Sequence, residues 1–158
     1  MAIEIERKFL LLNNTWRNEV SHSCHYQQGY LSSNSNSSIR IRTADEQAWL
    51  NIKSATIGNQ RQEYEYSIPL SDAREIMAQL CNKPVINKTR YFVHRSPHLW
   101  EIDEFYDDND GLIVAEIELS TPDESFELPQ WLGPEVTHDL RYYNNNLIQH
   151  PYREWRNN

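Results

Sequence analysis

Polar and apolar side chains alternate with a period of two through much of this chain, beginning at its N-terminus. In the first stretch, Glu4, Glu6 and Lys8 fall on one face of an extended segment, and Ile3 and Ile5 fall on the other. Runs rich in Ser, Asn, Asp, Gly or Pro separate such stretches, as turns do between strands. The pattern predicts eight strands, at residues 3–12, 25–31, 39–43, 48–54, 61–68, 85–94, 99–106 and 112–119.

Fewer segments show the spacing of a helix. Residues 71–80 carry apolar side chains at helical spacing behind Ser71, which we expect to be the N-cap. Shorter helical pieces are expected at residues 15–20, 122–127 and 141–148. Eight strands joined by short turns favour a barrel, because closure removes exposed strand edges. The predicted fold is therefore α+β, an eight-stranded closed antiparallel β-barrel with peripheral helices.

Composition narrows the class of protein. The 158 residues are 39% hydrophobic and 24% charged, which suits a single domain spanning residues 1–158 with its own core. A formal net charge of −8 argues against binding to nucleic acid or to anionic membranes in general. With no apolar run of membrane-spanning length, and with Glu4 and Glu6 interrupting the start, we expect neither a membrane span nor a signal peptide. Cys24 and Cys81 show no metal-type spacing and suggest a reduced, cytoplasmic setting, with one disulfide between them as the alternative.

The polar face of the predicted strands is almost entirely charged, and its charge is sorted by strand. Lys and Arg dominate on the third, fourth and sixth strands, carboxylates dominate on the first, seventh and eighth, and the fifth carries both. This face would either be exposed to solvent around an apolar barrel interior, or line a wet interior. An exposed face would mix in Thr, Ser and Gln, so the sorted charge favours a lined interior.

A wet interior with both signs of charge has a chemical use. Neighbouring carboxylates repel one another and prefer a divalent cation between them, and their hard oxygen atoms suit magnesium or manganese. Clustered Arg and Lys side chains suit phosphate oxygens, and Arg offers a bidentate fork. Metal on one wall and cations on the other would clamp a phosphate chain and offset the charge that develops in phosphoryl transfer.

Taken in order, the charged positions form short motifs that span almost the whole chain. They are Glu4-x-Glu6-x-Lys8, Arg40-x-Arg42, Lys53, Arg61-x-Glu63-x-Glu65, Lys88-x-Arg90, Asp103, Glu116-x-Glu118 and Asp139-x-Arg141. This set resembles the CYTH superfamily, the triphosphate tunnel metalloenzymes, and among them it is most similar to small bacterial inorganic triphosphatases. The resemblance implies an eight-stranded tunnel that hydrolyses or cyclises triphosphates with Mg²⁺ or Mn²⁺. It also implies that a C-terminal helix, the one carrying Arg141, plugs one end.

The resemblance assigns a role to each motif. Lys8 with Tyr30 resembles a dyad that activates the attacking water, whereas without the resemblance Tyr30 would be interpreted as a packing residue of the second strand. Metal would be held by Glu4, Glu6, Glu116 and Glu118 with help from Asp103, and Glu63 and Glu65 would support the site. Phosphate oxygens would be bound by Arg40, Arg42, Lys53, Arg61, Lys88, Arg90 and Arg141.

The predicted function is metal-dependent hydrolysis of inorganic tripolyphosphate to pyrophosphate and orthophosphate. Alternatives on the same tunnel are a class IV-type adenylate cyclase and a thiamine-triphosphatase, and a different class is a non-catalytic polyphosphate- or nucleotide-binding module. A charged lining offers adenine few favourable contacts. Trp49, however, shares the face of Lys53 and would offer a base an aromatic surface at the tunnel mouth. We expect a monomer or homodimer that binds a small-molecule triphosphate, with no nucleic acid or membrane partner.

Overall fold

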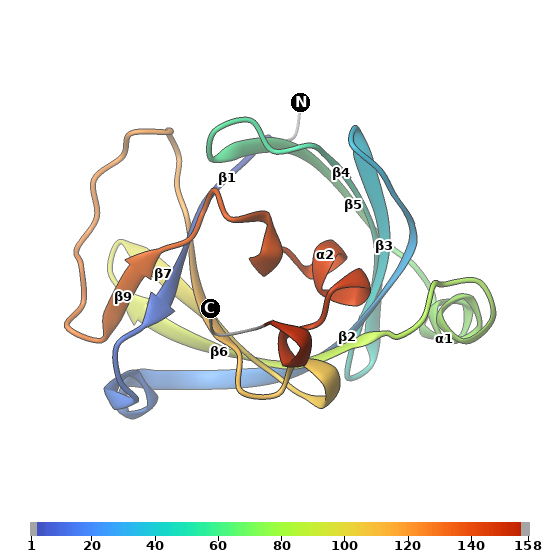
Figure 1. The fold of residues 1–158 in the computed structure, drawn as a ribbon, viewed down its shortest axis with the longest axis horizontal. Coiled ribbons are helices and arrows are strands. Elements are labelled where there is room, and N and C mark those ends of the chain that lie inside the picture. Colours follow the sequence, from blue (N-terminus) through green and yellow to red (C-terminus); the bar gives the residue numbers. More distant parts are fainter. Residues whose placement is uncertain (1–2, 156–158) are drawn as a thin grey trace.

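Eight strands close into an antiparallel barrel and a ninth short strand extends one side of it, as the computed structural model of residues 3–155 shows (Figure 1). The strands are β1 (Ile3–Leu11), β2 (Val20–Ser33), β3 (Ser37–Ala44), β4 (Gln47–Ser54), β5 (Gln60–Ser67), β6 (Ile86–Arg95), β7 (His98–Phe105), β8 (Ile113–Glu118) and β9 (Leu132–Glu135). The helices are α1 (Leu70–Gln79) and α2 (Asn144–Gln149), with 3₁₀ turns η1 (Thr15–Glu19), η2 (Asp107–Asn109), η3 (Leu140–Tyr142) and η4 (Tyr152–Glu154).

The first strand closes the barrel. The strand order is β5-β4-β3-β2-β6-β7-β8-β1, and β1 also pairs with β5. Ile3–Ile5 of β1 pair with β5, and Glu6–Phe9 pair with β8, so one strand joins both edges of the sheet. The predicted closed eight-stranded antiparallel barrel is confirmed.

The ninth strand was absent from the sequence prediction. β9 contains Gly133 and Pro134, both of which are depleted in strand interiors. It pairs with β1 so closely that a Cβ atom at Gly133 would lie 2.7 Å from the carbonyl oxygen of Leu10. Glycine is required there by the contact with β1, which local sequence patterns do not reveal.

One predicted helix is absent from the structure. No helix forms at residues 122–127, where Phe126 packs edge-on against the rings of Phe9 and Trp100 and the carboxylate of Glu124 accepts the N–H of Ser120. These tertiary and local contacts fix an irregular segment instead.

The ends of the other helices also differ from the prediction. The helix predicted at 71–80 begins at Leu70 with Pro69 as its N-cap, so Ser71 lies inside the helix rather than capping it. The helix predicted at 141–148 is divided into η3 and α2. The turn predicted at 15–20 is the 3₁₀ turn η1.

Apolar clusters on the outside of the barrel allow its interior to be polar. One cluster packs Phe9 and Trp100 of the strands against Phe126 and Trp131 of the 120–131 segment. Another lies beneath α1, which packs on the outer side of β2, β3 and β4 (Figure 1). The charged faces of the strands therefore line the interior, as the sorted charges favoured.

One end of the interior is apolar rather than charged. Ile86, Phe105, Leu112 and Val114 form a buried cluster with Leu147 of α2. Figure 1 shows α2 within the ring of strands, whereas α1 lies outside it. The C-terminal segment therefore closes part of one barrel end by hydrophobic packing.

The helices are short, and within residues 3–155 none has the length and apolar character needed to span a bilayer.

Candidate active site

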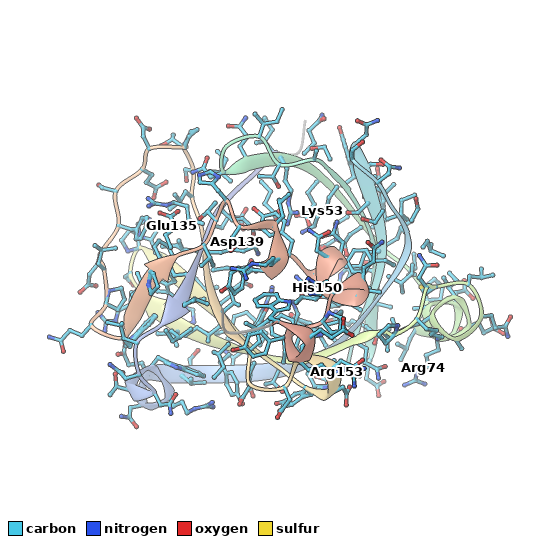
Figure 2. The ribbon with its side chains drawn as sticks, viewed as in Figure 1. Lys53, Arg74, Glu135, Asp139, His150 and Arg153 are labelled. Atoms are coloured by element: carbon cyan, nitrogen blue, oxygen red, sulfur yellow. The ribbon has the colours of Figure 1, made fainter. Side chains whose placement is uncertain are left out.

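The charged side chains meet in a cavity of about 220 Å³, which we call the charged cavity. Its walls come from strands distant in sequence, because inward-facing residues of each strand point to the same interior. Figure 2 shows Lys53 on the inner side of the ring and Arg74 on the outer helix α1. The lining residues are Glu4, Glu6, Lys8, Arg40, Arg42, Lys53, Arg61, Glu63, Glu65, Arg90, Glu101, Glu116, Glu118 and Asn144.

Carboxylates from β1 and β8 lie side by side on one wall. Glu6 is the register partner of Glu118, and Glu116 is the register partner of Lys8. Burial alone would raise the pKa of Glu4, but Lys53 and Arg61 lower it to about 2. Burial acts in the same way on Glu6, where Lys8 and Arg61 lower the pKa to about 2. Both groups are therefore charged at neutral pH.

Glu118 behaves differently, because its neighbours are acidic. Burial, together with the negative charges of Glu4, Glu101 and Glu6, raises the pKa of Glu118 to about 7. Around Glu118, the negative charge of the wall therefore exceeds the positive charge of the neighbouring basic side chains. Such a set of hard carboxylate oxygens fits a divalent cation of the magnesium type.

In this structure the carboxylates form ion pairs with basic side chains. Arg61 donates to Glu4 at 2.7 Å and to Glu6 at 3.1 Å, and Lys8 Nζ donates to Glu116 at 2.6 Å. As they stand, no three His, Cys, Asp or Glu side chains within residues 3–155 lie close enough together to hold a metal ion. The donor chemistry fits a cation, and binding one requires some of these ion pairs to rearrange.

Basic side chains form the facing wall, and Arg40 is the least satisfied of them. Arg40 is only 6% exposed, and its Nε atom has no hydrogen-bond partner within the described part of the chain. No carboxylate of residues 3–155 lies within ion-pair distance of Arg40, whereas Lys53 pairs with Glu63 at 3.1 Å. A buried guanidinium without an anionic partner is costly unless it binds an anion.

Arg42 is held between two aromatic rings at the outer part of the cavity. Its Cζ atom lies 4.5 Å from the ring centroid of Tyr26 and 5.1 Å from that of Trp49. Its only carboxylate contact in the described residues is Glu65, at 3.6 Å. Trp49, the aromatic surface that the sequence offers to a base, packs its ring against this guanidinium.

Asp103 forms a buried cluster with Lys88 and Arg90 behind the cavity wall. Its carboxylate accepts Lys88 Nζ at 2.7 Å and Arg90 Nε and Nη2 at 2.8 and 2.9 Å. Burial lowers the pKa of Lys88 to about 7, against the opposing effect of Asp103. Both Asp103 oxygens are thus engaged by cations, and of the three residues only Arg90 lines the charged cavity.

Lys8 and Tyr30 meet at the deep end. Together they line a cavity of about 20 Å³, which we call the neck, with Ser38, Arg40, Lys53, Arg61, Tyr143, Asn144 and Asn145. Burial lowers the pKa of Lys8, but Glu116 and Glu6 outweigh it and hold the pKa above its usual range. The Lys8 ammonium also lies 4.9 Å from the ring centroid of Tyr143. Lys8 is therefore a charged group and not a free base.

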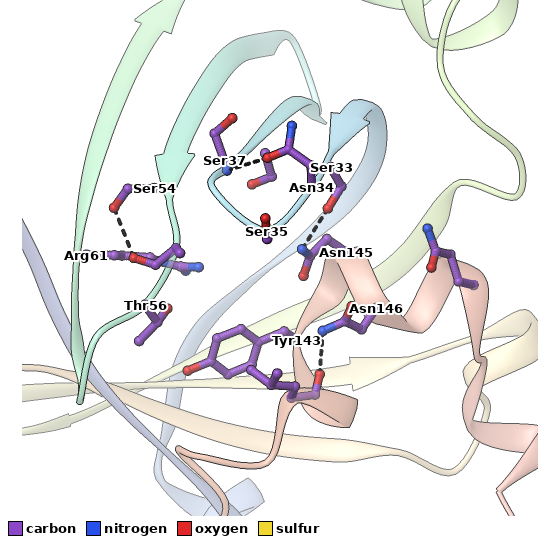
Figure 3. A pocket seen from close by; sticks show the side chains of 14 residues that line it. Ser33, Asn34, Ser35, Ser37, Ser54, Thr56, Arg61, Tyr143, Asn145 and Asn146 are labelled. Atoms are coloured by element: carbon purple, nitrogen blue, oxygen red, sulfur yellow. Dashed lines mark hydrogen bonds between the residues drawn. The ribbon is translucent and has the colours of Figure 1, made fainter.

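Beyond the neck lies a polar pocket of about 390 Å³, which we call the vestibule (Figure 3). The β2–β3 turn, the β4–β5 turn and α2 form it, and Asn145 Nδ2 donates to Ser33 Oγ at 2.9 Å across it. Its lining is mostly hydroxyl and amide groups, from Ser33, Asn34, Ser35, Ser37, Ser38, Ser54, Thr56, Asn145, Asn146 and Gln149, with Ala55, Arg61, Leu140 and Tyr143.

Most of the predicted site residues are brought together, but Arg141 is not. Its side chain is exposed and pairs with Asp139 at 2.6 Å, outside the charged cavity. Sequence reasoning did not assign Glu101, Tyr143 or Asn144 to the site. Glu101 carried a signal, since it shares the inward face of β7 with Asp103, whereas nothing periodic marks the two C-terminal residues.

A charged cavity inside a closed antiparallel barrel is the arrangement that the motif set resembles, and the family model described as the CYTH domain matches residues 2–152. The chain belongs to the CYTH domain family. This CYTH protein is 40% identical over 156 residues to an inorganic triphosphatase of Acetivibrio thermocellus, with 99% of each chain covered. It is 34% identical to an inorganic triphosphatase of Nitrosomonas europaea, over 91% of this chain and 95% of that one.

A solved structure supports the same grouping. The crystal structure of an inorganic triphosphatase superposes on this CYTH protein with a TM-score of 0.66 and 32% identity, covering 92% of this chain and 97% of that chain. The similarity therefore extends over nearly the whole barrel and its C-terminal segment.

Proposed function

We propose that this CYTH protein is a metal-dependent inorganic triphosphatase that hydrolyses tripolyphosphate to pyrophosphate and orthophosphate. The two relatives described above, which align with at least 91% of this chain, are inorganic triphosphatases. The observation that carries the proposal in this chain is Arg40, a buried guanidinium with an unpartnered Nε atom facing a wall of carboxylates. A phosphate chain supplies the anion that Arg40 lacks.

Each wall of the charged cavity has a separate task in this proposal. Arg40, Arg42, Lys53, Arg61 and Arg90 bind phosphate oxygens and balance the charge that develops as the phosphoanhydride bond breaks. Asp103 positions Arg90 and Lys88 rather than contacting metal, because its two oxygens are already engaged. Glu63 and Glu65 orient Lys53 and Arg42.

The carboxylate wall would hold the metal. Glu4, Glu6, Glu116 and Glu118 supply the hard oxygen donors, and Glu101 adds a further one, since it faces Glu116 across the β7–β8 pair. We propose Mg²⁺ or Mn²⁺, both of which prefer carboxylate ligands. When bound, such an ion neutralises phosphate charge and polarises phosphoryl oxygens.

The substrate preference follows from the lining. Nearly all groups that face the charged cavity are ionic, and the ring of Trp49 packs against the Arg42 guanidinium. We therefore expect tripolyphosphate to exceed ATP and thiamine triphosphate by at least about tenfold in kcat/KM, which needs about 1.4 kcal/mol of differential binding.

The deciding experiment measures phosphate release from tripolyphosphate, ATP and thiamine triphosphate, with Mg²⁺ or Mn²⁺ and with chelator. Release from tripolyphosphate that requires metal supports the proposal. Tight binding of tripolyphosphate without turnover would identify a binding module instead, and cyclic AMP from ATP would identify a cyclase.

We further propose that the protein acts in the cytoplasm, as a monomer or a homodimer. Within the described residues Cys24 and Cys81 are both free, which suits a reducing compartment. A disulfide between these cysteines in part of the protein isolated from cells, removed by a reducing agent, would count against this location.

A further inference from the structure

The neck connects the two larger cavities. It shares Arg40, Lys53 and Asn144 with the charged cavity, and it shares Ser38 and Asn145 with the vestibule. The three cavities therefore adjoin in the order charged cavity, neck and vestibule, with Lys8 and Tyr30 at the neck.

The two ends of this series of cavities differ in charge. At the outer mouth the carboxylates are partly exposed, with side-chain exposures of 41% for Glu65 and 27% for Glu101. At the vestibule the lining is hydroxyl and amide groups, and among the described residues that line it only Arg61 is charged. The vestibule can therefore hold water without binding a polyanion tightly.

The volume of the neck limits the size of the molecule that it can hold. A water molecule needs about 10–15 Å³ of cavity together with polar partners. The neck has about 20 Å³, with the unpartnered Nε of Arg40 and the polar groups of Tyr30 and Ser38 at its walls. It therefore has room for about one water, and too little for a phosphate group.

Phosphoryl transfer fixes the direction from which water arrives. The attacking and leaving oxygens lie roughly in line through the transferred phosphorus. A triphosphate that filled the charged cavity from the mouth would place one terminal phosphorus near Lys8 and Arg40, which line both this cavity and the neck, and its pyrophosphate would leave toward the mouth. The attacking oxygen must then come from the opposite side, which is the neck.

We infer that the neck holds the attacking water and that the vestibule supplies it from solvent behind the bound triphosphate. This inference rests on the proposed function. The water oxygen bonds to the terminal phosphorus as the bond from that phosphorus to the bridging oxygen breaks. The bridging oxygen keeps the electron pair and leaves as pyrophosphate, and the proton of the water passes to solvent in the vestibule. Ser38 and Asn145 are positioning residues in this route.

The first test narrows the neck. Ser38→Leu should lower kcat by about tenfold or more, about 1.4 kcal/mol of barrier, while KM for tripolyphosphate stays within about twofold. Ser38→Ala keeps the passage open but removes one polar partner of the water, so it should lower kcat less than Ser38→Leu does. Ser67→Leu, the same change at an exposed position of β5 outside the three cavities, is the control and should behave as wild type.

The second test widens the neck and reads a product ratio that the amount of folded enzyme does not alter. Asn145→Ala should admit methanol in place of water, so that its oxygen takes the phosphoryl group and methyl phosphate forms beside orthophosphate. The methyl phosphate fraction, measured by ³¹P NMR at fixed methanol, should rise several-fold over wild type. Asn82→Ala, an exposed position outside the three cavities, is the control.

The two hypotheses fail in different ways. A wild-type protein that releases no phosphate from tripolyphosphate refutes the proposed function and this route with it. An active wild type with unchanged kcat in Ser38→Leu, or with an unchanged methyl phosphate fraction in Asn145→Ala, overturns the route alone.

Discussion

Replacing Arg40 by methionine should make the protein more stable and less active. Arg40 is 6% exposed and its Nε has no partner among the described residues, and an unsatisfied buried polar group costs about 1–3 kcal/mol. Arg40 also adds to the positive charge that lowers the pKa values of Arg42 and Lys53, whose own burial is the larger cause. Methionine keeps the unbranched shape without charge, so we expect a gain of about 1–2 kcal/mol in unfolding free energy without metal or substrate.

Activity should change in the opposite direction. A hydrogen bond to a charged group contributes about 1.5–3 kcal/mol, so losing one phosphate contact should lower kcat/KM by about 10- to 150-fold. The assay pairs urea unfolding in chelator with phosphate release from tripolyphosphate. Arg74→Met, on the exposed face of α1, is the matched control and should change stability by less than about 0.5 kcal/mol. A destabilised Arg40→Met, or one that keeps wild-type kcat/KM, would refute the reasoning.

Three further predictions concern other groups of the site. The raised pKa of Glu118, about 7, means that the metal-free protein loses unfolding free energy as pH rises from about 4.5 to 7. Glu118→Gln should remove about 1 kcal/mol of that loss, a value reduced for solvent screening. A difference in unfolding free energy between wild type and variant that stays constant over about pH 4–8 would contradict this prediction. Asp103→Asn removes the charged partner of buried Lys88 and leaves Arg90 with only Glu101 among the described residues, so it should cost about 3–5 kcal/mol in urea unfolding; a loss below about 1 kcal/mol would count against the cluster. Trp49→Ala removes a cation–π contact with Arg42, so KM for tripolyphosphate should rise about two- to fivefold; selective loss of ATP hydrolysis would instead make Trp49 a base-stacking surface.

The barrel and the identity of its inner face could be predicted from the sequence, because both depend on a local rule. Side chains two residues apart share a strand face, so Glu4 with Glu6, Arg40 with Arg42 and Glu116 with Glu118 are sorted before any long-range contact is known. The charge on that face was informative because seven of the eight predicted strands repeated it. The ordered motif set then identified the CYTH family, which the comparisons confirmed.

Elements held by distant contacts were not predictable in this way. β9 forms because Gly133 permits close approach to β1, although a Gly-Pro pair argues locally against a strand. The helix expected at 122–127 is absent because Phe126 finds an aromatic cluster on the barrel wall. In both segments the free energy of tertiary packing outweighs local preference.

The division of work among similar charges was likewise decided only by the tertiary structure. From the sequence, Asp103 and Glu118 are both expected to help hold metal, and Arg40 and Arg141 are both expected to bind phosphate. Strand register places Asp103 between Lys88 and Arg90 while it surrounds Glu118 with other carboxylates, and the fold turns Arg141 outward to Asp139. Alternation tells which face a side chain occupies, but its partner comes from another strand, and electrostatic energy depends on that partner's charge and distance.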